Sequence, residues 1–349
     1  MISSRLLGIV RCPECRGVLD GQARILTCGS CGRVFEGQPD YLLLAPGASF
    51  EHTTKFLSES FHTAGRDATV APPLLAAGVR HKMLQRFLRL GPSDSVLDLG
   101  CGSGKFAVWN LASGAHMVGI DAGPFFAAEA RAAVDLIVGD LRALPLASAS
   151  MTKAYSLDVF EHLSRDGLLT TLREANRVLK PGGLLFVYTH VAERTPLQPL
   201  IQLIRAASQS LERLGLADLS YDKLRKSDHL NPLQSFDDLR AVAAAAGFRI
   251  AKLTYYTPLF SGLGENLVVP VAAHMWTRRK FRNVDSQAVE RTRADAKTAI
   301  AGRGLVYRAL SALTALAMLD VVLFGRWRAG PFFALLVKDD GESGPQGAN

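Results

Sequence analysis

Short apolar runs recur along the chain, and several of them end in a carboxylate or a glycine turn. Such runs predict buried strands of a mostly parallel sheet. They cover residues 95–99, 116–120, 135–138, 153–157, 184–190, 248–255 and 330–338. A helix is expected over Ser235–Ala246, because Ser235 suits an N-cap, two aspartates follow it, and Gly247 suits the C-terminal end. Strands and helices in this order predict an α/β fold.

Two long segments interrupt the sheet after its fifth and sixth strands. Residues 191–234 follow the fifth strand, and residues 256–329 separate the sixth strand from the last one. Both segments leave the carboxyl ends of strands, which is the side where open parallel sheets bind ligands. Apolar residues recur at helical spacing in the first segment, at Leu200, Leu203, Ile204, Ala207 and Leu211. We therefore expect helical cap insertions over the ligand side of the sheet.

Four of the five cysteines form two CxxC pairs near the N-terminus. The pairs are Cys12 with Cys15 and Cys28 with Cys31, and twelve residues separate them. Two such turns can aim four thiolates at one Zn²⁺, and a module this small needs a metal to fold. Disulfides or redox thiols are the alternative, and they fit an oxidising compartment better. Four cysteine ligands leave no open position, so the predicted zinc site is structural.

A glycine-rich turn follows the first strand of the predicted sheet. Gly100, Gly102 and Gly104 let the backbone approach a ligand closely, and the helix after them offers free N–H groups. Asp121 ends the second strand, where an acidic side chain can accept both hydroxyls of a ribose. Asp140 follows the third strand and suits the amine of an adenine. The pattern indicates an adenosine-containing ligand.

The motifs VLDLGCGSG, GID, GDLRALPLASAS, LDVFEHL and RVLKPGGLLFVYTH resemble those of class I S-adenosylmethionine-dependent methyltransferases. The similarity covers roughly residues 75–255 and is greatest to the type 11, ubiquinone-methyltransferase-like branch. It implies a Rossmann-like seven-stranded sheet, and a nicotinamide-binding domain is the structural alternative. Residues 7–44 resemble the zinc ribbon, similar to a tRNA-methyltransferase activator, that precedes several bacterial methyltransferases.

This resemblance implies roles for particular residues of the ligand side. The methionine half of S-adenosylmethionine would contact Asp98 and the three glycines, and Asp121 would bind the ribose. Asp140 and Leu141 would bind the adenine. Cys101 and Leu157 complete the expected cofactor site, with Cys101 as a packing residue rather than a nucleophile.

Candidate bases for methyl transfer lie after the fourth and fifth strands. They are Glu161, His162, His190 and His229, with His162 favoured, and each has a purely structural role as its alternative. The DxxEH pattern at Asp158, Glu161 and His162 is similar to the ExxEH that holds a divalent metal in some quinone O-methyltransferases. Asp replaces the first Glu here, so Mg²⁺ at these three residues is a weaker expectation than zinc at the cysteines.

The charge and hydropathy of the chain indicate what kind of partner the protein binds. The 349-residue chain has 48% hydrophobic residues and a formal net charge of +8, which suits an anionic partner. The longest charge-free apolar stretch, residues 309–319, is shorter than the roughly 18 residues of a spanning helix, so no span is expected. The basic cluster Arg278, Arg279, Lys280 and Arg282 suits phospholipid head groups, and a solvated face is its alternative. We expect a cytoplasmic protein, peripheral at the inner face of the membrane.

The sequence therefore predicts a methyltransferase acting on an apolar small-molecule or lipid-like acceptor. An rRNA or tRNA base methyltransferase, and an inactive cofactor-binding module, are the alternatives, with nucleic acid the less favoured partner. The expected organisation is a zinc ribbon (1–48), a linker with N-terminal helices (49–94), the cofactor-binding core (95–255), a basic and apolar lid (256–329), a last strand (330–340) and a disordered tail (341–349).

Overall fold

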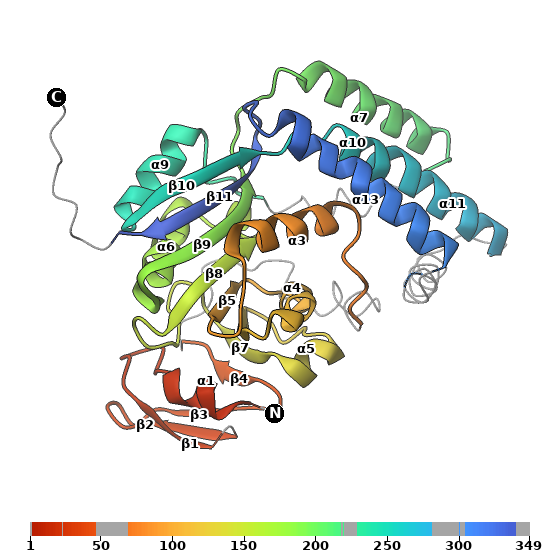
Figure 1. The fold of residues 1–349 in the computed structure, drawn as a ribbon. Coiled ribbons are helices and arrows are strands. Elements are labelled where there is room, and N and C mark those ends of the chain that lie inside the picture. Colours follow the sequence, from red (N-terminus) through yellow and green to blue (C-terminus); the bar gives the residue numbers. More distant parts are fainter. Residues whose placement is uncertain are drawn as a thin grey trace, which may run out of the picture.

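The computed structural model describes residues 2–22, 24–46, 69–217, 219, 229–280, 300 and 304–339. The predicted tail at 341–349 lies outside this part of the chain, and so do the side chains of the predicted basic cluster. Figure 1 shows a twisted sheet in the middle, the N-terminal module at one end, and a layer of long helices at the other.

The main sheet confirms the predicted α/β architecture and has one strand more than expected. Its order is β10-β11-β9-β8-β5-β6-β7-β4, in which β10 and β11 are antiparallel to their neighbours and the other pairs are parallel. The strands are β4 (Leu42–Leu44), β5 (Ser95–Leu99), β6 (His116–Asp121), β7 (Asp135–Gly139), β8 (Met151–Leu157), β9 (Leu179–His190), β10 (Phe248–Tyr255) and β11 (Pro331–Lys338).

The eighth strand, β4, comes from the end of the region predicted as zinc ribbon. Leu42 and Leu44 are fully buried, and the strand pairs in parallel with β7 at the sheet edge. The predicted ribbon range 1–48 thus ends in a strand of the main sheet. A three-residue apolar run carries no alternation long enough to assign it to a sheet from sequence.

Helices cover both faces of the sheet, and β5 is buried along its whole length between them. The covering helices are α3 (Leu75–Leu88), α4 (Lys105–Trp109), η2 (Leu111–Ser113), α5 (Ala128–Ala133), η3 (Phe160–His162), α6 (Arg165–Val178) and α9 (Phe236–Ala245). The predicted helix with a serine cap is confirmed as α9, whose cap Ser235 Oγ accepts from the Asp238 N–H at 3.1 Å.

The N-terminal module has a short helix, α1 (Ser4–Ile9), and a three-stranded antiparallel sheet. Its strands are β1 (Leu19–Gln22), β2 (Ile25–Cys28) and β3 (Val34–Glu36). The module packs on the main domain, because Leu6 and Val10 belong to the same buried cluster as β5 residues. An ion pair between Arg16 and Glu174, with N and O 2.9 Å apart, adds a polar tie.

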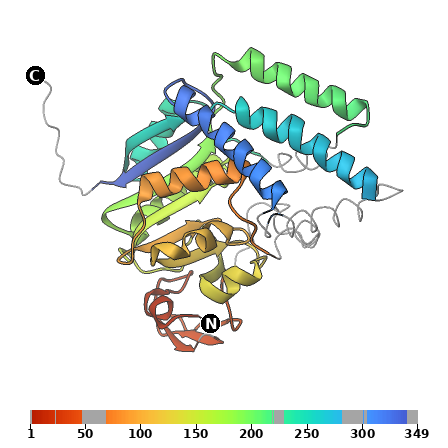
Figure 2. The ribbon, with the colours of Figure 1, turned by 45° about the vertical axis from the view of Figure 1, so that its right-hand side comes forward.

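The two insertions form the cap layer, defined as α7 (Gln198–Arg213), α10 (Phe260–Gly262), the π-helical η4 (Leu263–Val268), α11 (Val269–Lys280) and α13 (Leu305–Phe324). Figure 2 shows these helices gathered beyond the carboxyl ends of the parallel strands, where the sequence predicted them. One described helix, α13, is long and apolar enough to cross a membrane by length and composition alone. The expectation of no such segment counted only uncharged residues, whereas α13 includes Arg308 and Asp320.

Candidate functional site

The glycine turn after β5 has a backbone that only glycine adopts easily. Gly100, Gly102 and Gly104 all have positive φ, at 76°, 53° and 78°. A Cβ on Gly100 would lie 2.5 Å from a methyl group of Val159, so the turn packs closely against the segment after β8. The Gly102 N–H donates to Asp121 Oδ2 at 2.7 Å. The turn and the end of β6 thus form one unit.

Asp98 is a buried carboxyl group beneath this turn. It is 3% exposed, and Tyr155 donates its hydroxyl to Asp98 Oδ2 at 2.9 Å. Burial raises the pKa of Asp98 to about 8, with a contribution from the nearby Asp121 carboxylate, while the Tyr155 hydrogen bond and Lys105 lower it. A cationic ligand that reaches Asp98 would favour the ionised form.

The remaining predicted cofactor residues surround the ends of β7 and β8. Asp140 is buried and holds Arg142 in a bidentate pair, with Nη2 and Oδ2 2.7 Å apart, so its carboxylate already has a partner. Leu157 is 7% exposed at the end of β8, and Leu141 packs partly buried against the core. Burial raises the pKa of the Cys101 thiol well above its usual value. A protonated thiol suits packing better than nucleophilic attack.

The four candidate bases lie together, although they come from three separate segments. The His229 ring lies 4.7 Å from the His162 ring and 5.5 Å from the His190 ring, measured between centroids. Backbone N–H groups of Leu230 and Asn231 donate to the Glu161 carbonyl oxygen at 2.8 and 3.0 Å. These two bonds fix the end of the first insertion against η3, which is why His229 joins the cluster.

Glu161 is the member of this cluster best suited to proton transfer. Its side chain is buried, and Thr189 Oγ1 donates to Glu161 Oε2 at 2.8 Å. Burial raises the pKa of Glu161 to about 7, and the Asp158 carboxylate adds to the rise. A general base is most effective when its pKa lies near the working pH.

The DxxEH residues do not form one ligand set. Asp158, whose φ is 58°, makes an ion pair with Arg80 of α3. Among the described residues, the acidic and histidine side chains that could share a metal ion here are Glu161, His162 and His229, with ligand atoms within 4.8 Å of one another. His229 therefore takes the place predicted for Asp158.

Three residues that the sequence analysis missed lie beside this cluster. The Arg80 guanidinium lies 4.9 Å from the centroid of the Tyr188 ring, and the Tyr256 ring lies 6.1 Å from the same ring. Arg80 Nε and the Tyr256 hydroxyl are buried without a hydrogen-bond partner among the described residues. The sequence feature that could have indicated this site is Arg80. It lies four residues from both Ala76 and Leu84, so helical spacing places its charge on the buried face of the helix.

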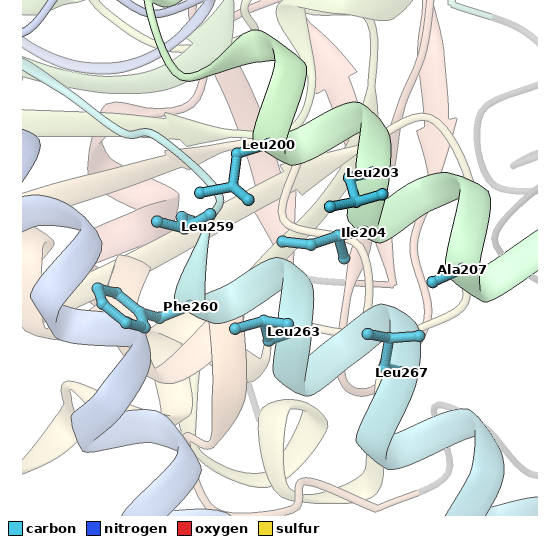
Figure 3. Close-up of a pocket in the computed structure, with 8 residues that line it drawn as sticks. All are labelled: Leu200, Leu203, Ile204, Ala207, Leu259, Phe260, Leu263 and Leu267. Atoms are coloured by element: carbon cyan, nitrogen blue, oxygen red, sulfur yellow. The ribbon is translucent and has the colours of Figure 1, made fainter.

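An apolar groove runs between the two insertions of the cap layer. Its volume is about 450 Å³, within the usual range for small-molecule sites. It is lined by Leu200, Leu203, Ile204, Ala207, Leu259, Phe260, Leu263 and Leu267. In Figure 3, α7 contributes one wall, and Leu259 with α10 and η4 contributes the other. Leu259 lies three residues after Tyr256, whose ring lies beside that of Tyr188.

The four N-terminal cysteines meet in the ribbon. Their sulfur atoms lie within 4.8 Å of one another, with Cys12 and Cys31 3.8 Å apart and Cys15 and Cys28 3.5 Å apart. Zn–S bonds of about 2.3 Å in a tetrahedron set sulfurs roughly 3.8 Å apart. A Cβ on Gly17 would lie 2.8 Å from the Cys28 sulfur, so glycine is required beside the cluster. This geometry fits a structural Zn²⁺.

Comparison with known proteins identifies the central domain. Residues 97–187 match the family model described as "Methyltransferase domain". Together with the sheet order and the glycine turn, this match shows that the chain contains a class I S-adenosylmethionine-dependent methyltransferase domain. The predicted family and fold are confirmed.

Relatives with curated names align with about half of the chain. A malonyl-[acyl-carrier protein] O-methyltransferase of Serratia marcescens is 28% identical over 176 residues, which cover 49% of this chain and 61% of the relative. A ubiquinone biosynthesis O-methyltransferase of Azorhizobium caulinodans is 30% identical over 165 residues, covering 45% of this chain and 60% of the relative. The chain thus matches less than two thirds of the length of either.

A similar fold occurs in a solved structure of phosphoethanolamine N-methyltransferase 2 of Haemonchus contortus. Its TM-score is 0.51 at 16% identity, and the match covers 83% of this chain and 61% of that chain. This likeness concerns the fold alone.

Proposed function

We propose that the protein transfers a methyl group from S-adenosylmethionine to an apolar, lipid-like small molecule. The observation that carries the proposal is the groove of about 450 Å³ lined only by apolar side chains from both insertions. The insertions are additions to the sheet, and they lie beyond its ligand side. A groove of this kind suits an alkyl, acyl or prenyl chain.

The residues of the site support this reaction in distinct ways. S-adenosylmethionine supplies an electrophilic methyl group on a sulfonium centre. The glycine turn and Asp98 would hold its methionine half, and Asp121 its ribose. Glu161, with its pKa near 7, would accept the proton of the acceptor, while His162 and His229 position the reacting atom.

An oxygen atom is the favoured methyl acceptor. Both curated relatives described above are named O-methyltransferases. A hydroxyl or carboxyl group has a proton that a base can remove, and the buried donors on Arg80 and Tyr256 suit an oxygen-bearing end of the acceptor.

The Glu161, His162 and His229 set also fits a divalent cation, which would bind the acceptor oxygen. Its test is methyl transfer after EDTA treatment in samples whose ribbon zinc is shown to be retained. Activity lost with EDTA and restored by Mg²⁺ supports the ion, and activity unchanged by EDTA excludes it.

The experiment first measures S-adenosylmethionine binding by calorimetry, and then transfer of its labelled methyl group. Decyl hydroquinone, decanoic acid and decylamine are suitable probes, because they share one chain length and differ in the accepting group. Bulk tRNA and rRNA form a separate arm. We expect label in a decyl probe, most of all in one with an oxygen acceptor.

Ala207 and Ala206 offer a matched pair of variants. Both are exposed on α7, but only Ala207 lines the groove. Ala207→Trp should fill the groove and raise the KM for decyl probes at least about tenfold, while Ala206→Trp leaves it unchanged. Label that enters only RNA would contradict the proposal, and absent cofactor binding would indicate an inactive module.

A further inference from the structure

The face of α13 that is attached to the rest of the domain contains two polar residues beside the buried Ala317 and Val321. Asp320 is fully buried, and its carboxylate accepts the backbone N–H groups of Leu259, Phe260 and Ser261 at 3.1, 2.8 and 2.8 Å. Six residues earlier, Thr314 Oγ1 accepts the Leu75 N–H at 2.7 Å. These bonds fix one face of α13 to α10 and to the start of α3.

The opposite face of α13 is exposed and apolar. Leu305, Leu316, Val322 and Leu323 are 86, 37, 64 and 54% exposed. Three alanines lie between them on the same face, and Arg308 is the only charged residue among the exposed positions of this helix. A surface helix of a protein that meets only water has the reverse arrangement, with its apolar face inward.

Exposed apolar side chains are concentrated in the cap layer and the segments that continue it. Of the fifteen large apolar side chains that are exposed in the described part of the chain, eleven lie between Leu200 and Leu216 or between Val268 and Trp327. Leu200 and Leu203 are among them, and they also line the groove. The α7 wall of the groove is therefore partly exposed.

Charged and aromatic residues lie at both ends of the exposed face. Arg308 lies in the first turn of α13, and the exposed Arg326, Trp327 and Arg328 follow its last turn. The only carboxylate of the helix, that of Asp320, is buried. Arginines that flank an apolar stripe, with tryptophan at the boundary, are typical of a helix lying in an anionic membrane interface.

We propose that the cap layer docks on a membrane containing anionic lipids, with α13 lying in the plane of the interface and the acceptor groove open to the lipid. The bonds of Thr314 and Asp320 hold one side of α13 on the protein, so the helix lies on the bilayer rather than crossing it. This inference extends the proposed function by naming the surface from which a lipid-like acceptor enters.

Vesicle co-sedimentation tests the docking with the full-length, zinc-loaded chain. The probes are vesicles of phosphatidylcholine alone and of phosphatidylcholine with one quarter phosphatidylglycerol. We expect binding to the mixed vesicles, weakened at high salt, and at least about tenfold weaker binding by the double variant Val322→Glu/Leu323→Glu. The matched control is Ile25→Glu/Val34→Glu, because these ribbon residues are 59 and 55% exposed.

The outcomes separate this inference from the proposed function. A wild-type chain that stays in the supernatant with both vesicles, or a double variant that binds as well as wild type, overturns the docking. A dimer in light scattering that the same double variant dissociates would assign the face to a second copy instead. Transfer to soluble decyl probes should survive in the double variant, so its loss would implicate the proposed function and not the docking.

Discussion

Asp98 should make the binding of S-adenosylmethionine depend on pH. Burial raises the pKa of this carboxyl to about 8 in the unliganded protein. Lys105 and the Tyr155 hydroxyl favour the ionised form, and the Asp121 carboxylate disfavours it. The ligand carries positive charge on its sulfonium and ammonium groups, so it binds best when Asp98 is ionised.

The size of the effect follows from the fraction of ionised Asp98. With a pKa of about 8, that fraction falls from about one half at pH 8 to about 3% at pH 6.5. Affinity should therefore fall about sixteenfold over this range, or roughly 1.6 kcal/mol. Binding at pH 6.5 should release about one proton per chain.

The unliganded protein should respond to pH in the opposite direction. Its folded state keeps the Asp98 proton up to about pH 8, whereas the unfolded chain loses it near the usual pKa of 3.8. The folded state binds more protons within that window, so this group's contribution to the free energy of unfolding falls as pH rises.

Calorimetry at pH 6.5 and 8, in buffers of different ionisation enthalpy, measures both the affinity and the released proton. The control is Asp98→Asn, which should bind more weakly at pH 8 and lose most of the pH dependence. An affinity that is equal at the two pH values in the wild-type chain, with no proton released, would refute the reasoning.

Three other predictions concern the ribbon, the base and the cap layer. The chain should contain one Zn²⁺ by mass spectrometry, and Cys28→Ser should lose both the metal and the protease resistance of the ribbon; a metal-free ribbon that resists protease would contradict this. At saturating S-adenosylmethionine, the kcat/KM for the methyl acceptor should rise with pH about a midpoint near 7 as Glu161 ionises, and Glu161→Gln should abolish that rise; an unchanged profile would exclude Glu161 as the base. Asp320→Leu leaves three buried N–H groups without an acceptor and should cost at least about 3 kcal/mol in urea unfolding, against a negligible change for the exposed Asp237→Asn.

The fold could be predicted because its signals are local. Each of the seven expected strands is an apolar run bounded by a turn, and the residues around Gly100 to Gly104 adopt the positive φ values that three glycines permit. The Ser235 cap and the CxxC spacing likewise depend on neighbours in sequence. Short-range geometry is sufficient for all of these features.

Contacts between residues far apart in the chain could not be predicted from the sequence. Asp158 was expected beside Glu161 as a metal ligand, but it pairs with Arg80, which lies 78 residues earlier. His229 joins the cluster only because the Glu161 carbonyl accepts the N–H groups after it. Such contacts depend on how the insertions return to the sheet, and hydrophobic periodicity does not encode that path.

Helix α13 turns an isolated carboxylate toward the protein. Asp320 interrupts an apolar stretch, and an isolated carboxylate in such a stretch is expected to face water, because burying a charge is costly. Three converging N–H groups offset that cost, so Asp320 lies on the attached side with Val321, while Leu316, Val322 and Leu323 are exposed. The cap layer is therefore held to the domain partly by polar bonds, which leaves apolar area for something other than its own core. A protein that buried those side chains for stability alone would have turned the helix the other way, and this is the physical reason to look for a lipid surface on that face.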